Sequence, residues 1–281
     1  MTQDPLISAD WLVANIDQPS VRVLDATWVP PFLKDRPTGK VSFAEAHVPG
    51  ANYFDIDDIA DTETSLSHML PKVSLFDEKV SDLGVSNDTH VIVYDSNGFF
   101  ASARAWWMFR AMGHEQVHVL DGGLQAWRNA GGEVVSGTEQ QAPRGQFQAL
   151  RGPELIRDMQ AMRIHVDRGD AKILDARDQG RFDGTSPEPR AGLASGHMPG
   201  SFCVPASGLL DSDKKMKTAE DLAPLLSDFI DAPVITSCGS GVSAAVIALA
   251  LARLGNWDAA VYDGSWSEWA AHPDNPIAAK P

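Results

Sequence analysis

One cysteine in the sequence lies where a strand is expected to give way to a helix. Cys238 follows the apolar run 234–237, and the apolar run 244–254 has the length of a buried helix. The short loop between them contains Gly239 and Gly241. A thiol at a helix N-terminus faces free backbone N–H groups and the positive end of the helix dipole, which favour its thiolate. The sequence therefore predicts a nucleophilic cysteine, although a lone cysteine is more often an inert buried residue.

The chain also contains two copies of one pattern. The repeated motifs are Val/Ile-Leu-Asp-Ala at 23–26 and 173–176, and His-x-Pro-Gly at 47–50 and 197–200. In the same alignment, Asp95 stands where Cys238 stands. Two copies of this length indicate two tandem domains rather than a solenoid, which needs at least three short repeats. The first copy keeps the pattern of the fold and lacks the nucleophile.

Within each copy, short apolar strands alternate with helical stretches. The expected strands are 21–24, 91–94, 117–120, 173–174, 234–236 and 259–262, and the main expected helices are 101–112 and 244–254. This alternation predicts an α/β fold in which a mainly parallel sheet is covered by helices on both faces. We expect a first domain at 1–135, a linker at 136–152 and a second domain at 153–281.

Composition narrows the classes of function. The net charge of −15 argues against nucleic acid or an anionic membrane as a partner. The two cysteines, Cys203 and Cys238, are too few for a disulfide framework, and no Cys/His cluster has the spacing of a zinc site, so we expect no metal. No apolar run is long enough to span a bilayer, and the first residues do not resemble a secretory signal. We therefore expect a cytoplasmic protein.

Together these motifs resemble the rhodanese family of sulfurtransferases over nearly the whole chain. The resemblance extends to the Asp-Gly-Gly…Trp pattern at 121–127 and its counterpart at 263–269. The loop Cys-Gly-Ser-Gly-Val-Ser-Ala at 238–244 is most similar to the 3-mercaptopyruvate enzymes of the family, because the thiosulfate enzymes typically carry basic residues after the cysteine. The resemblance implies two tandem rhodanese-like domains, the first of them catalytically inactive.

The resemblance also implies which residues form the site. Arg181 and Arg190 map onto two arginines that bind substrate, and a guanidinium group can hold a carboxylate through two parallel hydrogen bonds. Backbone N–H groups of the loop are expected to stabilise anionic sulfur on Cys238. These loop residues are Gly239, Gly241, Val242 and Ser243.

A proton donor for the product is harder to identify. Ser240 and His47 are the candidates that the resemblance supplies. His197 occupies the same motif in the second copy as His47 does in the first, so a structural role for the histidine in this turn is an equal alternative. The aspartate that would complete the group does not map onto this chain, and Asp35 is the position we would try first.

The expected function is transfer of sulfane sulfur from 3-mercaptopyruvate through a persulfide on Cys238, with release of pyruvate and without a cofactor. The acceptor would be cyanide or a thiol, such as thioredoxin or a small thiol. A thiosulfate sulfurtransferase is the alternative, followed by a non-enzymatic sulfur carrier or binding module. A phosphatase is disfavoured because Ala244 stands where the phosphate-binding arginine would be needed. Cys203 is expected to be buried and inert.

Overall fold

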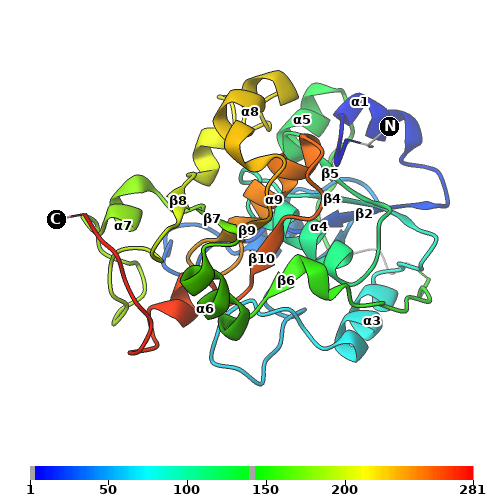
Figure 1. Cartoon of the computed structure of the whole chain (residues 1–281). Helices are drawn as coiled ribbons and strands as arrows, with labels where there is room; N and C mark the ends of the chain where they lie inside the picture. The colour runs from blue at the N-terminus through cyan, green and yellow to red at the C-terminus, as the bar shows by residue number, and fades with distance from the viewer. Residues whose placement is uncertain (1–3, 139–142, 281) are drawn as a thin grey trace. The chain divides into compact units, whose positions relative to one another are not determined.

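The computed structural model describes residues 4–138 and 143–280, which form two units (Figure 1). Contacts group 1–62, 70–152 and 212–216 into the first unit, and 63–69, 153–211 and 217–281 into the second. Segment 63–69 therefore groups with the second unit although its neighbours in sequence belong to the first. Segment 212–216 groups with the first unit although its neighbours belong to the second. The domain limits given above remain a prediction, and residues 139–142 of the expected linker lie outside the described residues.

Each unit contains one five-stranded sheet in which every pair of neighbouring strands is parallel. The first sheet has the order β1-β5-β4-β2-β3, and the second has the order β6-β10-β9-β7-β8. The strands are β1 (Leu6–Ile7), β2 (Val21–Asp25), β3 (Asn52–Tyr53), β4 (His90–Tyr94), β5 (Val117–Leu120), β6 (Ile156–Arg157), β7 (Lys172–Asp175), β8 (Phe202–Cys203), β9 (Val234–Ser237) and β10 (Ala260–Tyr262). The two orders are identical strand for strand, as the sequence repeat predicts.

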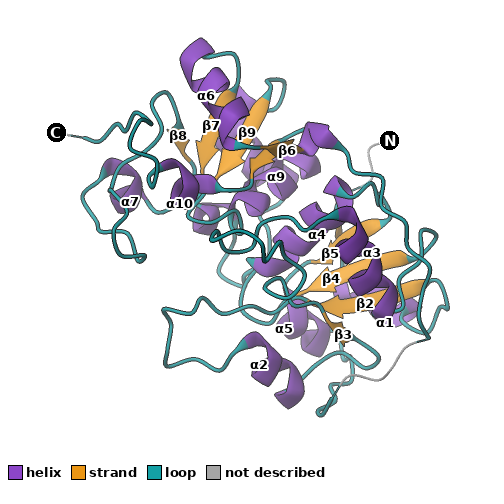
Figure 2. Ribbon diagram, turned by 90° about the horizontal axis from the view of Figure 1, so that it is seen from below, coloured by secondary structure: helices purple, strands orange, loops and turns teal. Residues whose placement is uncertain are grey.

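Helices cover both faces of each sheet (Figures 1 and 2). The helices are α1 (Ala9–Asn15), α2 (Gly39–Glu45), α3 (Val73–Asp82), α4 (Ala101–Ala111), α5 (Gly123–Asn129), α6 (Met159–Arg168), α7 (Gln179–Asp183), α8 (Ala219–Leu226), α9 (Ala244–Arg253) and α10 (Ser265–Trp269). In the first unit, α1, α2 and α5 pack on one face of the sheet, and α4, with α3 against it, packs on the other. In the second unit, α6 and α10 pack on one face, and α9 and α8 pack on the other. The predicted α/β fold is confirmed.

The helices α4 and α9, which follow central strands, begin without a side-chain cap, as α3, α5 and α10 also do. Side chains cap the N-termini of five helices, through Ser8, Thr38, Asp158, Asp178 and Thr218. No side-chain cap is found on α4, which follows β4, or on α9, which follows β9. The first N–H groups of a helix need a partner, so these two helices leave donors for the loop in front of them. Among the residues described, no helix has the length and apolarity to cross a membrane.

A buried carboxyl group at the end of β2 distinguishes the first unit from the second. Asp25 is fully buried, and its Oδ1 accepts a hydrogen bond of 2.7 Å from the backbone N–H of Thr27. In the second unit the corresponding Asp175 pairs with Arg177, whereas Thr27 brings no charge to Asp25. Burial raises the pKa of Asp25 to about 6, and the nearby Asp95 carboxylate acts in the same direction.

Replacing this carboxyl group should change how stability depends on pH. A carboxyl group with a raised pKa in the folded state stabilises the fold below its unfolded pKa, and this contribution is lost as the pH rises through the folded pKa. Asp25→Asn should therefore gain stability relative to the native chain between about pH 4 and pH 7, by about 3 kcal/mol. The difference in unfolding free energy between the two chains cancels the contributions of other titrating groups. One such group is His118, because burial lowers its pKa to about 4.

Urea denaturation of both chains across this range provides the measurement. Asp17→Asn, at an exposed aspartate of the same unit, is the matched control and should show a difference that does not vary with pH. A constant difference for Asp25→Asn as well would contradict the account of the buried carboxyl group.

Candidate active site

The site is centred on the loop that connects β9 to α9 in the second unit. Cys238 directly follows β9 and is 2% exposed. Gly241 has a φ of 78°, a left-handed backbone conformation that glycine adopts without steric cost. The helix that follows is buried at every position from Ala244 to Ala252. The cysteine is therefore fixed on rigid elements on both sides, at the C-terminal edge of a parallel sheet, where ligands of such sheets bind.

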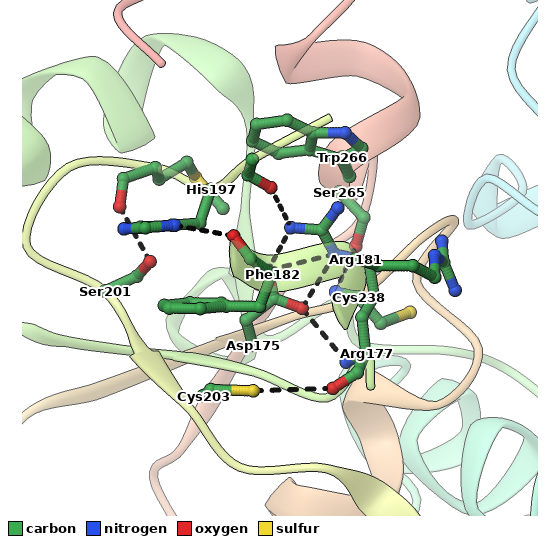
Figure 3. Close-up of polar contacts among 12 residues, drawn as sticks. Asp175, Arg177, Arg181, Phe182, His197, Ser201, Cys203, Cys238, Ser265 and Trp266 are labelled. Carbon is green, nitrogen blue, oxygen red and sulfur yellow. Dashed lines mark hydrogen bonds and ion pairs between the residues drawn. The ribbon is translucent and has the colours of Figure 1, made fainter. Parts of the chain in front are cut away.

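Helix α10 holds the first part of this loop in place. The backbone N–H of Cys238 donates to Ser265 Oγ at 3.1 Å, and the backbone N–H of Trp266 donates to the Cys238 carbonyl at 2.9 Å (Figure 3). The Gly239 carbonyl accepts from the backbone N–H of Ser267 at 3.0 Å and from its hydroxyl group at 2.5 Å. The carbonyl groups of the first two loop residues are thus satisfied by α10.

The corresponding loop of the first unit shows what this backbone conformation binds. Asp95 Oδ1 accepts hydrogen bonds from the backbone N–H groups of Gly98, at 3.0 Å, and Phe99, at 2.9 Å. Its Oδ2 accepts from the backbone N–H of Ser102, at 3.1 Å, and from the Ser102 hydroxyl, at 2.9 Å. The carboxylate fills a ring of donors at the start of α4. The loop is therefore a cradle for a negative charge, and in the first unit its own side chain occupies it.

The internal alignment transfers this ring of donors to the second unit. Gly98, Phe99 and Ser102 align with Gly241, Val242 and Ala245. The N–H groups of these three residues are therefore the expected donors to a negative charge at Cys238. The comparison supports Gly241 and Val242, which were named from the sequence, and adds Ala245, which sequence reasoning missed and whose N–H donates to the Val242 carbonyl at 3.3 Å in this structure. It does not extend to Gly239 or Ser243, whose counterparts do not bond to Asp95.

Two arginines lie against the same loop. A Cβ atom built on Gly239 would lie 3.0 Å from Nη2 of Arg181 and 3.6 Å from Nη1 of Arg190. Arg181 belongs to α7 (Figure 3), and Arg190 lies in the loop after it. The structure thus brings both predicted arginines to the residue next to Cys238. Glycine at position 239 leaves room for the two guanidinium groups.

A buried chain of ion pairs holds one of these arginines. Arg181 donates from Nη2 to Oε2 of Glu188 at 2.6 Å and from Nε to Oε1 at 3.1 Å. Arg177 also donates to Glu188, at 2.8 Å, and pairs with Asp175 at 2.6 Å. The side chains of Arg177 and Asp175 are fully buried, and that of Glu188 is 2% exposed. The guanidinium group of Arg177 also stacks over Trp266 at 4.3 Å.

Arg177 keeps its charge despite its burial. Burial alone would lower the pKa of Arg177, but hydrogen bonding to Asp175 and the charges of Asp175 and Glu188 outweigh it and raise that pKa. Sequence reasoning did not single out these three residues. A signal was available at one of them, because the repeated Leu-Asp-Ala motif is followed by Thr27 in the first copy and by Arg177 in the second.

The two serines of the loop occupy different environments. Ser240 is 8% exposed and lies two residues beyond the nucleophile. Ser243 precedes α9 in a helical backbone conformation, and its side chain makes no capping hydrogen bond. A part for Ser240 in proton transfer stays a prediction.

His47 has the contacts of a residue that shapes a turn. Its ring stacks on Phe43 with a centroid distance of 4.1 Å, and its Nδ1 lies 2.8 Å from the Phe43 carbonyl oxygen. In the second unit, His197 stacks on Phe182 at 3.9 Å, with Nδ1 2.7 Å from the Phe182 carbonyl oxygen (Figure 3). Identical contacts in both copies, one of which lacks the nucleophile, favour the structural alternative. A catalytic role for His47 remains a prediction.

A different histidine packs with the second unit. His68 belongs to the segment 63–69, which contacts assign to that unit. It is 5% exposed and has a φ of 65°, which is unusual for a residue other than glycine. Such strained residues cluster at functional sites. Sequence reasoning did not select His68, since it lies outside the repeated motifs. Asp35, the aspartate suggested from the sequence, is exposed.

Cys203 differs from expectation in its burial. It lies at the end of β8, the edge strand, and is half-buried rather than buried. Its Sγ is 3.6 Å from the Arg177 carbonyl oxygen, to which the thiol donates. Burial raises the pKa of Cys203 to about 11, and the charge of Asp175 adds to the effect. Cys203 therefore stays protonated at neutral pH and is a poor nucleophile.

Comparison with known proteins places these features in context. The rhodanese-like domain model matches residues 8–130 and 158–272. The chain is 41% identical over 299 residues to thiosulfate/3-mercaptopyruvate sulfurtransferase 1, mitochondrial, of Arabidopsis thaliana, covering 98% of this chain and 78% of that protein. It is 39% identical over 274 residues to 3-mercaptopyruvate sulfurtransferase of Escherichia coli, covering 96% of each.

The solved structures agree with the sequence matches. The crystal structure of SseA from Escherichia coli, described as a 3-mercaptopyruvate sulfotransferase with the rhodanese fold, superposes with a TM-score of 0.85. The two chains are 36% identical, and the match covers 94% of this chain and 99% of that one.

The cradle of the first unit leads to a prediction about stability. Asp95→Ala removes the acceptor for three buried backbone donors, so the free energy of unfolding should fall by about 2–4 kcal/mol. Asp95→Asn retains one side-chain oxygen and should lose less. Asp88→Ala, at an exposed aspartate, is the control, and its stability should stay within about 0.5 kcal/mol of native. Urea denaturation is the measurement, and an Asp95→Ala chain as stable as this control would contradict the proposed cradle.

Proposed function

This chain belongs to the rhodanese-like domain family, and on that premise we propose that it transfers sulfane sulfur from 3-mercaptopyruvate to a thiol or to cyanide. The observation that carries the proposal is the position of Arg181 and Arg190 beside Gly239, one residue from Cys238. A nucleophilic thiol and two carboxylate-binding groups within the span of one small molecule match a donor with sulfur at one end and carboxylate at the other.

The reaction proceeds in two half-reactions. The Cys238 thiolate attacks the sulfur atom of 3-mercaptopyruvate, and a new S–S bond forms while the C–S bond breaks. The bonding electron pair leaves with carbon as pyruvate enolate, which takes up a proton to give pyruvate. The thiolate of the acceptor then attacks the outer sulfur, and Cys238 departs as thiolate. Covalent catalysis of this kind gives ping-pong kinetics.

The loop backbone stabilises sulfur anions in both half-reactions. The N–H groups of Gly241, Val242 and Ala245 occupy the positions whose counterparts bind the Asp95 carboxylate in the first unit. Fixed donors of this kind need no reorganisation when charge develops, which is why they lower a barrier. The first unit has the Asp95 carboxylate in this ring and cannot carry sulfur there.

The two arginines contribute differently to donor binding. Arg190 has no carboxylate partner in residues 4–138 and 143–280, so its charge is available to the donor. Arg181 forms an ion pair with Glu188, which partly neutralises its charge and holds it in a fixed orientation. A keto acid bound between them would direct its sulfur toward Cys238.

The enolate proton is assigned to Ser240, which is buried in the loop beside the nucleophile. The stacking of His47 on Phe43 supports a structural role for that histidine instead.

Thiosulfate is the second donor to consider, since the name of the Arabidopsis relative includes both substrates. Thiosulfate carries two negative charges next to the reacting sulfur and benefits from cations in the loop. Gly239 and Ser240 provide none, which favours 3-mercaptopyruvate. Thioredoxin or a small thiol is the proposed acceptor, and the cytoplasm is the proposed location, although that Arabidopsis relative is named as mitochondrial.

The nucleophile is tested by one substitution. Cys238→Ser should abolish release of pyruvate from 3-mercaptopyruvate and formation of thiocyanate from thiosulfate and cyanide, because oxygen at this position cannot carry the transferred sulfur. Cys203→Ser is the matched control and should retain native activity with both donors. A Cys238→Ser protein that still turns over either donor would refute the assignment, provided that its thermal melt matches the native one.

The arginines are tested by comparing donors. Arg190→Ala and Arg181→Ala should each lower kcat/KM for 3-mercaptopyruvate by about tenfold to a hundredfold, the effect of losing one charged hydrogen-bond partner. The loss with thiosulfate should be smaller, since it has no carboxylate. Arg168→Ala, at an exposed position of the same unit, controls for the lost surface charge. Equal losses with both donors would count against carboxylate binding.

A further inference from the structure

We propose that Glu188 sets the net charge at the carboxylate-binding end of the site and so selects a monoanionic sulfur donor over a dianionic one. The inference rests on the proposed function and deepens it, because it names the residue that determines which donor is accepted. Glu188 acts through the arginines and is a positioning and specificity-determining residue.

The geometry makes Glu188 part of the site rather than of the surface. Its side chain is 2% exposed, and both of its oxygens are paired within the unit. Oε1 accepts from Nη1 of Arg177 and Nε of Arg181, and Oε2 accepts from Nη2 of Arg181. That same Nη2 atom lies 3.0 Å from a Cβ built on Gly239. This guanidinium nitrogen thus pairs with Glu188 and lies beside Gly239 of the loop.

The charges of this group nearly cancel. Asp175 neutralises Arg177, and Glu188 neutralises Arg181, through ion pairs of 2.6 Å each. Of these three arginines, Arg190 alone has no carboxylate partner among the described residues. The binding end therefore presents about one net positive charge, although three guanidinium groups lie in it.

One net positive charge matches one carboxylate. The 3-mercaptopyruvate anion carries a single charge at the end that meets the arginines, so binding leaves no excess charge there. Thiosulfate would bring a second negative charge next to Glu188, and the repulsion is large where water is excluded. Without Glu188, the same arginines would present about two positive charges and would suit a dianion.

The test is the ratio of kcat/KM for thiosulfate to that for 3-mercaptopyruvate. Glu188→Gln keeps the size of the side chain and one acceptor oxygen but removes the charge. We expect this ratio to rise by about tenfold, mainly through a lower KM for thiosulfate. Glu154→Gln removes one negative charge at an exposed position of the same unit and should leave the ratio unchanged.

A conservative variant separates charge from packing. Glu188→Asp keeps the charge but is too short to reach both arginines, so kcat/KM should fall with both donors while their ratio stays near the native value. If the ratio changed equally in Glu188→Asp and Glu188→Gln, the effect would come from the lost hold on Arg181, and the charge-based inference would be wrong.

A binding measurement on the native protein keeps the inference testable even if the variants do not fold. Pyruvate and oxalate are similar in size, and oxalate carries one more negative charge. The native protein should be inhibited at least tenfold more strongly by pyruvate than by oxalate in competition with 3-mercaptopyruvate. Equal or stronger inhibition by oxalate would overturn the role of Glu188.

The outcomes also distinguish this inference from the proposed function. A native protein that uses thiosulfate in preference to 3-mercaptopyruvate overturns the proposed donor. A native protein that prefers 3-mercaptopyruvate, with an unchanged ratio in a folded Glu188→Gln variant, overturns the role of Glu188 alone.

Discussion

The structure depends on the need of a helix N-terminus for a partner. In both units a central parallel strand ends at a tight loop, and the helix that follows starts without a side-chain cap. The donors left over must bind a negative charge. Asp95 supplies that charge permanently in the first unit, where its carboxylate accepts three backbone N–H groups. Cys238 stands at the aligned position in the second unit, and its thiolate and persulfide are the negative charges that we propose this loop stabilises.

A second constraint is that a buried charge must be paired. Arg177 and Arg181 lie close together in the second unit, since both donate to Glu188. Two buried positive charges so close would be unfavourable without negative partners. Asp175 and Glu188 make the arrangement stable, and their positions determine where Arg181 points. The first unit has Thr27 in place of Arg177, so its aspartate is buried without a cation and has a raised pKa. The two units thus differ in charge at two aligned pairs of positions, Thr27 with Arg177 and Asp95 with Cys238.

The longer strands of both sheets and the helices α4 and α9 could be predicted from the sequence, because their apolar runs are local signals and the internal repeat marks them in both copies. The two-residue strands β1, β3, β6 and β8 could not, since they have too few residues for a pattern. The pairing of Glu188 with Arg177 and Arg181 could not, since it depends on how a Pro-rich loop folds back on β7. The family resemblance makes His47 a candidate, but the same motif in the second copy, where His197 also stacks on a phenylalanine, favours a structural role. The burial of Cys203 was overestimated because an apolar stretch at a sheet edge keeps one side open.

The most direct test of the account is to locate the transferred sulfur. The native protein would be treated with 3-mercaptopyruvate without an acceptor, digested without reductant, and its peptides analysed by mass spectrometry. The account predicts one added sulfur atom on the peptide that contains Cys238 and none on the peptide that contains Cys203, with one pyruvate released per chain. Added sulfur on Cys203, or pyruvate release without a persulfide at Cys238, would contradict it.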